Sequence, residues 1–242
     1  MPCQDVTLDT LLNGRVKLRQ YRGGYRFSID AAILARHIRP RPGDFIVDLG
    51  TGCGVVPLVA ACRHPDVTAV GVEIQPELAA LARENAALNG LSDRMCILEM
   101  DMKDLTPAVI KRPPDWVVSN PPYRPMGSGR LNPNSQRALA RHEIAVRLDD
   151  VAAAAGRILR TGGRFLLMYA AVRLADVFAA LRRHRIEPKV LRLVHGRIDA
   201  PAKMMLVEGA KAAASGLTAA APLVVYNEEG AYTAEVRDLL GK

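Results

Sequence analysis

Short apolar runs alternate with segments of helical periodicity along most of the chain. The runs FIVDLG, AVGVE, MCILEM, DWVVS and GRFLLMY have the length and composition of strands that are buried on both faces. Most of them are separated by segments such as residues 76–90, which start with Pro76, repeat apolar residues at i, i+3 and i+4, and stop at Gly90. This alternation predicts an α/β fold with a mostly parallel sheet and helices on both faces.

The N-terminal part of the chain follows a different pattern. Asn13 and Gly14 lie between two apolar stretches, which predicts a β-hairpin. Residues 28–38 then predict a helix with Ser28 as its N-cap. We therefore expect an N-terminal hairpin or extension over residues 1–27, followed by one domain over residues 28–242.

The C-terminal part predicts further strands. Residues 189–195 and 203–211 are two apolar runs joined by GRIDAPA, and they predict an antiparallel hairpin at the edge of the sheet. Residues 222–240 predict a last strand that is followed by a polar tail.

The composition limits the class of protein. The 242 residues are 49% hydrophobic, which is enough for one sizeable core. The sequence has no apolar run of about 18 residues and no basic-then-apolar leader, so we expect a cytoplasmic protein. The four cysteines form no C-x-x-C pair and the five histidines show no metal-ligand spacing, which predicts free thiols and no metal.

The net charge suggests a class of partner. Lys and Arg number 33 and Asp and Glu number 25, so the formal charge is 33 − 25 = +8, and the pI is about 9.6. Such a charge favours polyanionic partners such as nucleic acid. A generally basic, soluble enzyme is equally consistent with it.

Acidic residues and glycines follow successive predicted strands. The first of these strands runs into DLGTGCG, which contains Asp48, Gly50, Gly52 and Gly54. The spacing is G-x-G-x-G and differs from the G-x-G-x-x-G of dinucleotide folds, so a purely structural turn is the alternative.

The next two predicted strands also end in acids. Glu73 ends the second strand, where a carboxylate can bind both hydroxyls of a ribose, and Asp101 follows the third, where it can accept a hydrogen bond from an adenine amino group. Three acids at the same edge of a parallel sheet predict a cofactor site.

These motifs together resemble a known class of enzymes. DLGTGCG, GVEI, MDM and NPPY, in this order over roughly residues 20–170, resemble the class I S-adenosylmethionine-dependent methyltransferases. The resemblance implies a Rossmann-like, seven-stranded sheet, with the methionine part at Asp48 and the glycine turn, the ribose at Glu73, and the adenine at Asp101. The cofactor site implied by the resemblance also includes Tyr25, Arg26, Phe27, Ile74, Met102 and Asn120. Packing of the N-terminal hairpin is the alternative for Tyr25, Arg26 and Phe27.

The NPPY segment resembles the signature of the enzymes that methylate planar amino or amide nitrogens. The side-chain oxygen of Asn120 and the backbone carbonyl of Pro121 can each accept an N–H and aim the nitrogen lone pair at the methyl donor. Pro121 and Pro122 hold the backbone rigid because each ring fixes φ, and Tyr123 offers a flat face on which a base can stack. The alternative for NPPY is a rigid turn with a half-buried tyrosine.

A narrower resemblance suggests a substrate. Residues 11–35, ARHE at residues 140–143 and VHGRIDAPAKMMLVEGAK near the end are similar to the bacterial tRNA(Val) adenine-37 N6-methyltransferase family. This resemblance implies N6-methylation of an adenine in the anticodon loop of tRNA. N5-methylation of a glutamine side chain in a translation factor, and N6-methylation of adenine in rRNA or DNA, are the alternatives. The enzymes that modify glutamine usually carry a helical domain before the core, and here 47 residues precede Asp48.

Weaker signals accompany these motifs. His142 could position a substrate, although a surface or capping histidine is the more ordinary interpretation. A patch that faces RNA is predicted from basic residues near the C-terminal helices and strands, although a solvated helix face explains part of it. Its members are Arg182, Arg183, Arg185, Lys189, Arg192 and Arg197.

Overall fold

The sheet that the sequence predicts forms the centre of the molecule. The computed structural model describes residues 6–22, 29–121 and 148–241. In these ranges one sheet has the strand order β10-β8-β9-β7-β6-β3-β4-β5, and β11 also pairs with β8. Its long strands are β3 (Phe45–Leu49), β4 (Thr68–Glu73), β5 (Met95–Glu99), β6 (Trp116–Ser119), β7 (Arg164–Ala170), β8 (Ile186–His195) and β9 (Ala202–Lys211).

The strand directions agree with the expected fold class. The neighbours from β5 through β7 are all parallel, and β9 is antiparallel to both β7 and β8. The predicted hairpin of β8 and β9 is confirmed. The last strand predicted within residues 222–240 corresponds to the two-residue strand β11 (Leu223–Val224), whereas β10 (Thr218–Ala219) was not expected; both run parallel to β8.

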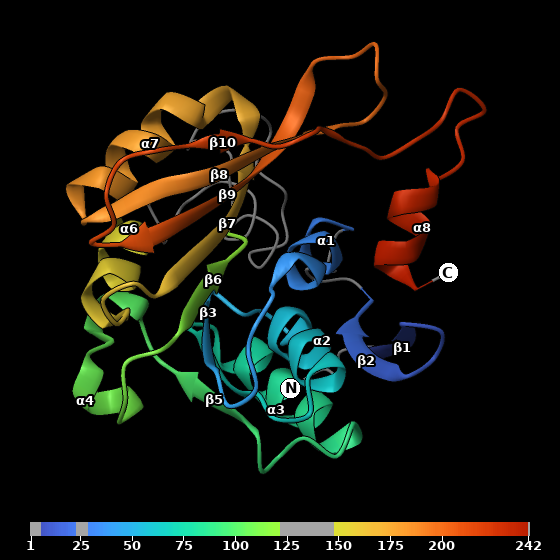
Figure 1. Cartoon of the computed structure of the whole chain (residues 1–242). Helices are drawn as coiled ribbons and strands as arrows, with labels where there is room; N and C mark the ends of the chain where they lie inside the picture. Colours follow the sequence, from blue (N-terminus) through green and yellow to red (C-terminus); the bar gives the residue numbers. More distant parts are fainter. Residues whose placement is uncertain (1–5, 23–28, 122–147, 242) are drawn as a thin grey trace.

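Helices cover both faces of the sheet, as Figure 1 shows. Val118, Leu166 and Met168 face one hydrophobic cluster, whereas their neighbours Val117 and Leu167 face the other. The first cluster contains α1 (Ile29–His37), α2 (Val55–Arg63) and α3 (Pro76–Leu88); the second contains α6 (Leu148–Ile158), α7 (Leu174–Arg183) and the short α4 (Pro107–Ile110). Because both faces are buried, the strands are continuous apolar runs.

The N-terminal hairpin consists of β1 (Val6–Leu11) and β2 (Val16–Tyr21), so the hairpin predicted at Asn13 is confirmed. It is fastened to α3 by side-chain amides. Asn85 Oδ1 accepts from Arg19 N at 2.7 Å, and Asn89 Oδ1 accepts from Lys17 N at 2.8 Å. The division of the chain after residue 27 stays a prediction.

The predicted polar tail is wrong, because residues 234–240 form the helix α8 (Ala234–Leu240). Thr233 caps this helix by accepting from Val236 N at 3.4 Å. Val236 and Leu240, four residues apart, are buried in the cluster that contains α1. The sequence signal for this helix is weak, because only Val236 and Leu240 are buried and Leu239 is partly buried against the same cluster.

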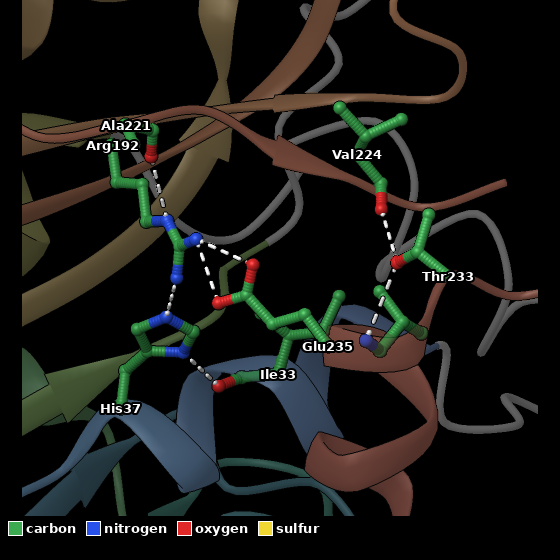
Figure 2. A network of polar contacts seen from close by, with 8 residues as sticks. Ile33, His37, Arg192, Ala221, Val224, Thr233 and Glu235 are labelled. Carbon is green, nitrogen blue, oxygen red and sulfur yellow. Dashed lines mark hydrogen bonds and ion pairs between the residues drawn. The ribbon is translucent and has the colours of Figure 1, made fainter. Parts of the chain in front are cut away.

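A polar network holds α8 against the rest of the molecule (Figure 2). Arg192 on β8 donates to both carboxylate oxygens of Glu235, at 2.7 and 2.9 Å, and to Ala221 O at 3.0 Å. It also lies 3.0 Å from Nε2 of His37, whose Nδ1 is 2.7 Å from Ile33 O. Burial lowers the pKa of His37, so the neutral ring accepts from Arg192.

No helix in the described ranges combines the length and apolar character needed to cross a membrane.

Candidate active site

The glycine turn follows β3 at the edge where the parallel strands end. Gly50, Gly52 and Gly54 have φ values of 74°, 58° and 85°, which L-residues with side chains rarely adopt. The N–H groups of Gly50 and Thr51 donate to Val72 O at 2.9 and 3.0 Å, so the turn is fixed to β4. The turn then leads into α2, and its backbone lies beside the neighbouring strand ends.

Gly54 is required for a second reason. A Cβ at this position would lie 2.9 Å from Met95 Cε and 3.2 Å from Ala82 Cβ. The turn is therefore packed against α3 and β5, and even a methyl group would disturb it.

Glu73 at the end of β4 joins the glycine turn to α3. Its side chain is 5% exposed, Oε2 accepts from Gly52 N at 2.8 Å, and Oε1 accepts from Gln75 N at 2.9 Å. Burial raises the pKa of Glu73, and these backbone hydrogen bonds oppose the rise. Each oxygen keeps a second lone pair for a ligand.

Asp48 lies opposite Gly71 in the parallel pair of β3 and β4, two residues before Glu73. Its side chain is fully buried, and burial raises its pKa to about 7. The negative charge of Glu73 adds to this rise. Two buried carboxylates at adjacent strand ends create a site that favours a cation.

Asp101 and Met102 lie where the chain leaves β5. Asp101 caps the 3₁₀ turn η1 (Met102–Asp104) by accepting from Lys103 N at 2.9 Å, and it pairs with Lys103 Nζ at 3.1 Å. Met102 is buried, and its Cε would lie 3.8 Å from a Cβ built at Gly50. Ile74, the residue after Glu73, is 43% exposed.

Asn120 follows β6, the strand that pairs with β3 on the side opposite β4. The hydroxyl of Ser119 donates to Leu49 O at 2.7 Å and so ties the end of β6 to the glycine turn. Oδ1 of Asn120 is shielded from solvent and has no hydrogen-bond partner among the described residues, and Pro121 is buried. A shielded amide oxygen without a donor is uncommon in folded proteins.

The structure thus brings together the ends of β3, β4 and β6 and the turn after β5. Tyr25, Arg26, Phe27, Pro122 and Tyr123 lie outside the described residues, as do Ser28 and His142. Two residues of the site were not predicted from the sequence. Ser119 reads as an ordinary strand residue, but its hydroxyl binds Leu49 O. Arg157 lies on α6, far along the chain, and contacts the turn after β5. Neither belongs to a recognisable motif.

Three of the six residues of the predicted basic patch form ion pairs within the protein. Arg182 pairs with Glu187 at 2.8 Å, and Arg183 pairs with Asp149. The prediction is wrong for Arg192, whose side chain is 18% exposed and bound to Glu235. Lys189 and Arg197 donate to backbone carbonyl groups, whereas no partner is found for the side chain of Arg185 within the described part of the chain.

Cys53, Cys62 and Cys96 are free thiols. Among the described residues, no three His, Cys, Asp or Glu side chains are grouped as ligands of a metal ion.

Comparison with known proteins identifies the family. A family model described as the methyltransferase small domain matches residues 25–183. The chain belongs to this family. The match includes β3 to β7 and thus every described residue of the candidate active site.

Two solved structures have the same fold. A crystal structure described as a predicted O-methyltransferase, protein Atu636 from Agrobacterium tumefaciens, has a TM-score of 0.70 at 27% identity and covers 87% of this chain and 94% of that one. TYW2 from P. horikoshii, in complex with MeSAdo, has a TM-score of 0.61 at 17% identity and covers 88% and 74%.

Curated relatives of this chain are named tRNA1(Val) (adenine(37)-N6)-methyltransferase. The relative from Porphyromonas gingivalis strain W83 is 35% identical over 154 residues, which cover 63% of this chain and 57% of the relative. The relative from Aeromonas hydrophila is 35% identical over 124 residues, which cover 51% and 50%. The chain thus matches little more than half the length of these relatives.

We predict that Gly54→Ala destabilises the protein more than Gly43→Ala does. The two glycines have nearly equal φ values, 85° and 83°, but a Cβ at Gly43 has nothing within 4 Å. Gly43→Ala should cost about 1–2 kcal/mol from backbone strain alone, and Gly54→Ala about 1–3 kcal/mol more from overpacking. Urea unfolding of both variants measures the difference, and equal losses would contradict the close packing of the turn.

Proposed function

We propose that this protein transfers a methyl group from S-adenosylmethionine to the N6 amino group of an adenine in tRNA, in the region of the anticodon loop. The observation that carries the proposal is the unpaired, shielded Oδ1 of Asn120, next to the strand ends that carry Asp48 and Glu73. An N–H of the substrate is the donor that this oxygen lacks. The names of the relatives support adenine N6 and tRNA as the acceptor.

The described residues fit the cofactor. The buried carboxylates of Asp48 and Glu73 favour a ligand with positive charge, and S-adenosylmethionine carries an ammonium and a sulfonium group. We assign the methionine part to Asp48 and the glycine turn, and the ribose hydroxyls to the free lone pairs of Glu73. The adenine would lie against the exposed Ile74 and beside Met102, with its amino group toward Asp101.

The acceptor nitrogen needs orientation more than it needs a base. An amino group on an aromatic ring has a delocalised lone pair and protons too weakly acidic for a side chain to remove first. The Asn120 side-chain oxygen and the Pro121 carbonyl can each accept one of its two N–H bonds and so stabilise positive charge as it develops on nitrogen. S-Adenosylmethionine supplies the methyl group when bound. We propose the rest of the motif, Pro122 and Tyr123, as the rigid link and the stacking face.

A glutamine side-chain amide also offers two N–H bonds, and it is therefore the main rival substrate. A hydroxyl substrate is less suitable, because it offers one hydrogen to two acceptors. The relatives' names favour the RNA substrate over both.

We predict that the protein methylates intact tRNA, that it methylates an anticodon stem-loop more weakly, and that duplex DNA and a glutamine-bearing release-factor peptide are inactive. An adenine in an unpaired loop can enter the site at a smaller unstacking cost than an adenine in a duplex. Radiolabelled methyl transfer to the four substrates, followed by mass spectrometry of the nucleosides, tests this. Transfer to the peptide but not to RNA would establish the rival.

Asn120→Ala should lower kcat by a factor on the order of 100–1,000, because an oriented acceptor is lost mainly in the transition state. Cofactor affinity should change far less. Stability should be unchanged or slightly higher, because the variant removes an unpaired buried oxygen. Steady-state kinetics and thermal unfolding measure both effects.

The matched control is Asn227→Ala, which removes an exposed amide whose Oδ1 accepts from Ala231 N. The control should keep full activity. An Asn120→Ala enzyme with normal kcat would mean that NPPY is only a rigid turn.

We predict that affinity for S-adenosylhomocysteine falls as the pH drops below about 7. A cationic ligand favours the carboxylate form of Asp48, whose pKa is raised to about 7 in the free protein. The affinity is therefore highest above this pH. It falls as Asp48 becomes protonated, by up to about tenfold per pH unit. Calorimetry between pH 5.5 and 8.5 measures the profile. Asp48→Asn should bind more weakly and remove the Asp48 step, and a flat wild-type profile would argue against the assigned role of Asp48.

A further inference from the structure

Arg157, on the last turn of α6, binds the turn that follows β5. Its Nε donates to Leu105 O at 2.6 Å, and its Nη2 donates to Met102 O and Lys103 O, each at 2.9 Å. One guanidinium thus holds three carbonyl groups of the segment in which Asp101 and Met102 lie.

This segment has few other backbone supports. Asp101 caps η1 at its start, and Asp104 N and Leu105 N donate to Asp101 O at 3.0 Å and to Met102 O at 3.2 Å. A single 3₁₀ turn leaves its last carbonyls without a following turn to satisfy them. The side chains of Met102 and Leu105 are buried beneath it, and Arg157 supplies the missing donors from outside.

The guanidinium is suited to this task in a way that other side chains are not. Its donors are fixed in a planar fork, so it can hold several carbonyls in one geometry, whereas a lysine ammonium is a single point with flexible reach. The position of Asp101 relative to the strand ends therefore depends on a helix that is distant in the sequence.

We propose that Arg157 is a positioning residue for the adenine of the cofactor and that it acts through Asp101 and Met102. This inference rests on the proposed function, because it requires that the cofactor's adenine binds at the turn after β5. It goes further by assigning the recognition of the 6-amino group to a turn that α6 holds in place. The same helix begins at Leu148, after the segment that follows NPPY in the chain.

The plain alternative is that Arg157 only stabilises the fold. The two roles differ in what they predict for ligand discrimination. A purely structural arginine changes the unfolding free energy and leaves the preference between two bound ligands unchanged. A positioning residue changes that preference.

The test compares Arg157→Met with Arg160→Met. Arg160 is an exposed arginine three residues later, pairs with Asp115 at 2.6 Å and donates to Thr161 O, and it does not contact the turn after β5. Calorimetry measures binding of S-adenosylhomocysteine and of its inosine analogue, in which a 6-oxo group replaces the 6-amino group. Kinetics at saturating cofactor measure kcat.

For Arg157→Met we expect roughly tenfold weaker binding of S-adenosylhomocysteine, the loss of most of the preference over the inosine analogue, and a kcat within about twofold of wild type. Arg157→Lys should recover part of the preference, and it serves as the test if Arg157→Met does not fold. Arg160→Met should match wild type in all three measurements.

The failures can be told apart. Wild-type protein that binds no S-adenosylhomocysteine would overturn the cofactor assignment and the inference with it. Wild-type protein that prefers the adenine ligand, with an unchanged preference in both Arg157 variants, would overturn the inference alone. An equal loss of preference in Arg160→Met would also overturn it.

Discussion

The carboxylate of Glu73 is buried at the end of β4 and is bound by the N–H groups of Gly52 and Gln75. A buried carboxylate has to be satisfied by hydrogen bonds, and here both donors come from the backbone. This requirement fixes the glycine turn relative to Gln75, the N-cap of α3. The residues that we assign to the methionine part and to the ribose therefore share one anchor, and a shift of either segment would leave the Glu73 carboxylate without a donor.

The end of β6, which carries Asn120, is also fixed to the glycine turn. The hydroxyl of Ser119 donates to the carbonyl of Leu49, so the end of β6 is fixed relative to the glycine turn, which Glu73 also binds. Asn120 follows directly, with an oxygen that no described residue satisfies. Backbone donors thus satisfy the carboxylate of Glu73, whereas the Oδ1 of Asn120 finds no donor among the described residues.

Much of this arrangement could be predicted from the sequence, because parallel strands that are buried on both faces have continuous apolar sequences. Asp48, Glu73 and Asp101 could be placed at one edge because the ends of parallel strands coincide there. The interactions that depend on distant partners could not be predicted. Arg183 is paired with Asp149, 34 positions away, and α8 is recognisable only once α1 is seen to cover Val236.

The short strands β10 and β11 have a consequence for the whole molecule. The ten-residue strand β8 would otherwise expose a row of unpaired backbone groups, which is a template for pairing with another chain. β10 occupies the positions opposite Val190 and Leu191, and β11 those opposite Val194 and His195. The segment of residues 212–222, which is rich in small side chains, and β11 thus protect this edge of β8 from pairing with another chain. A change that lengthens or loosens this segment would first affect solubility rather than catalysis.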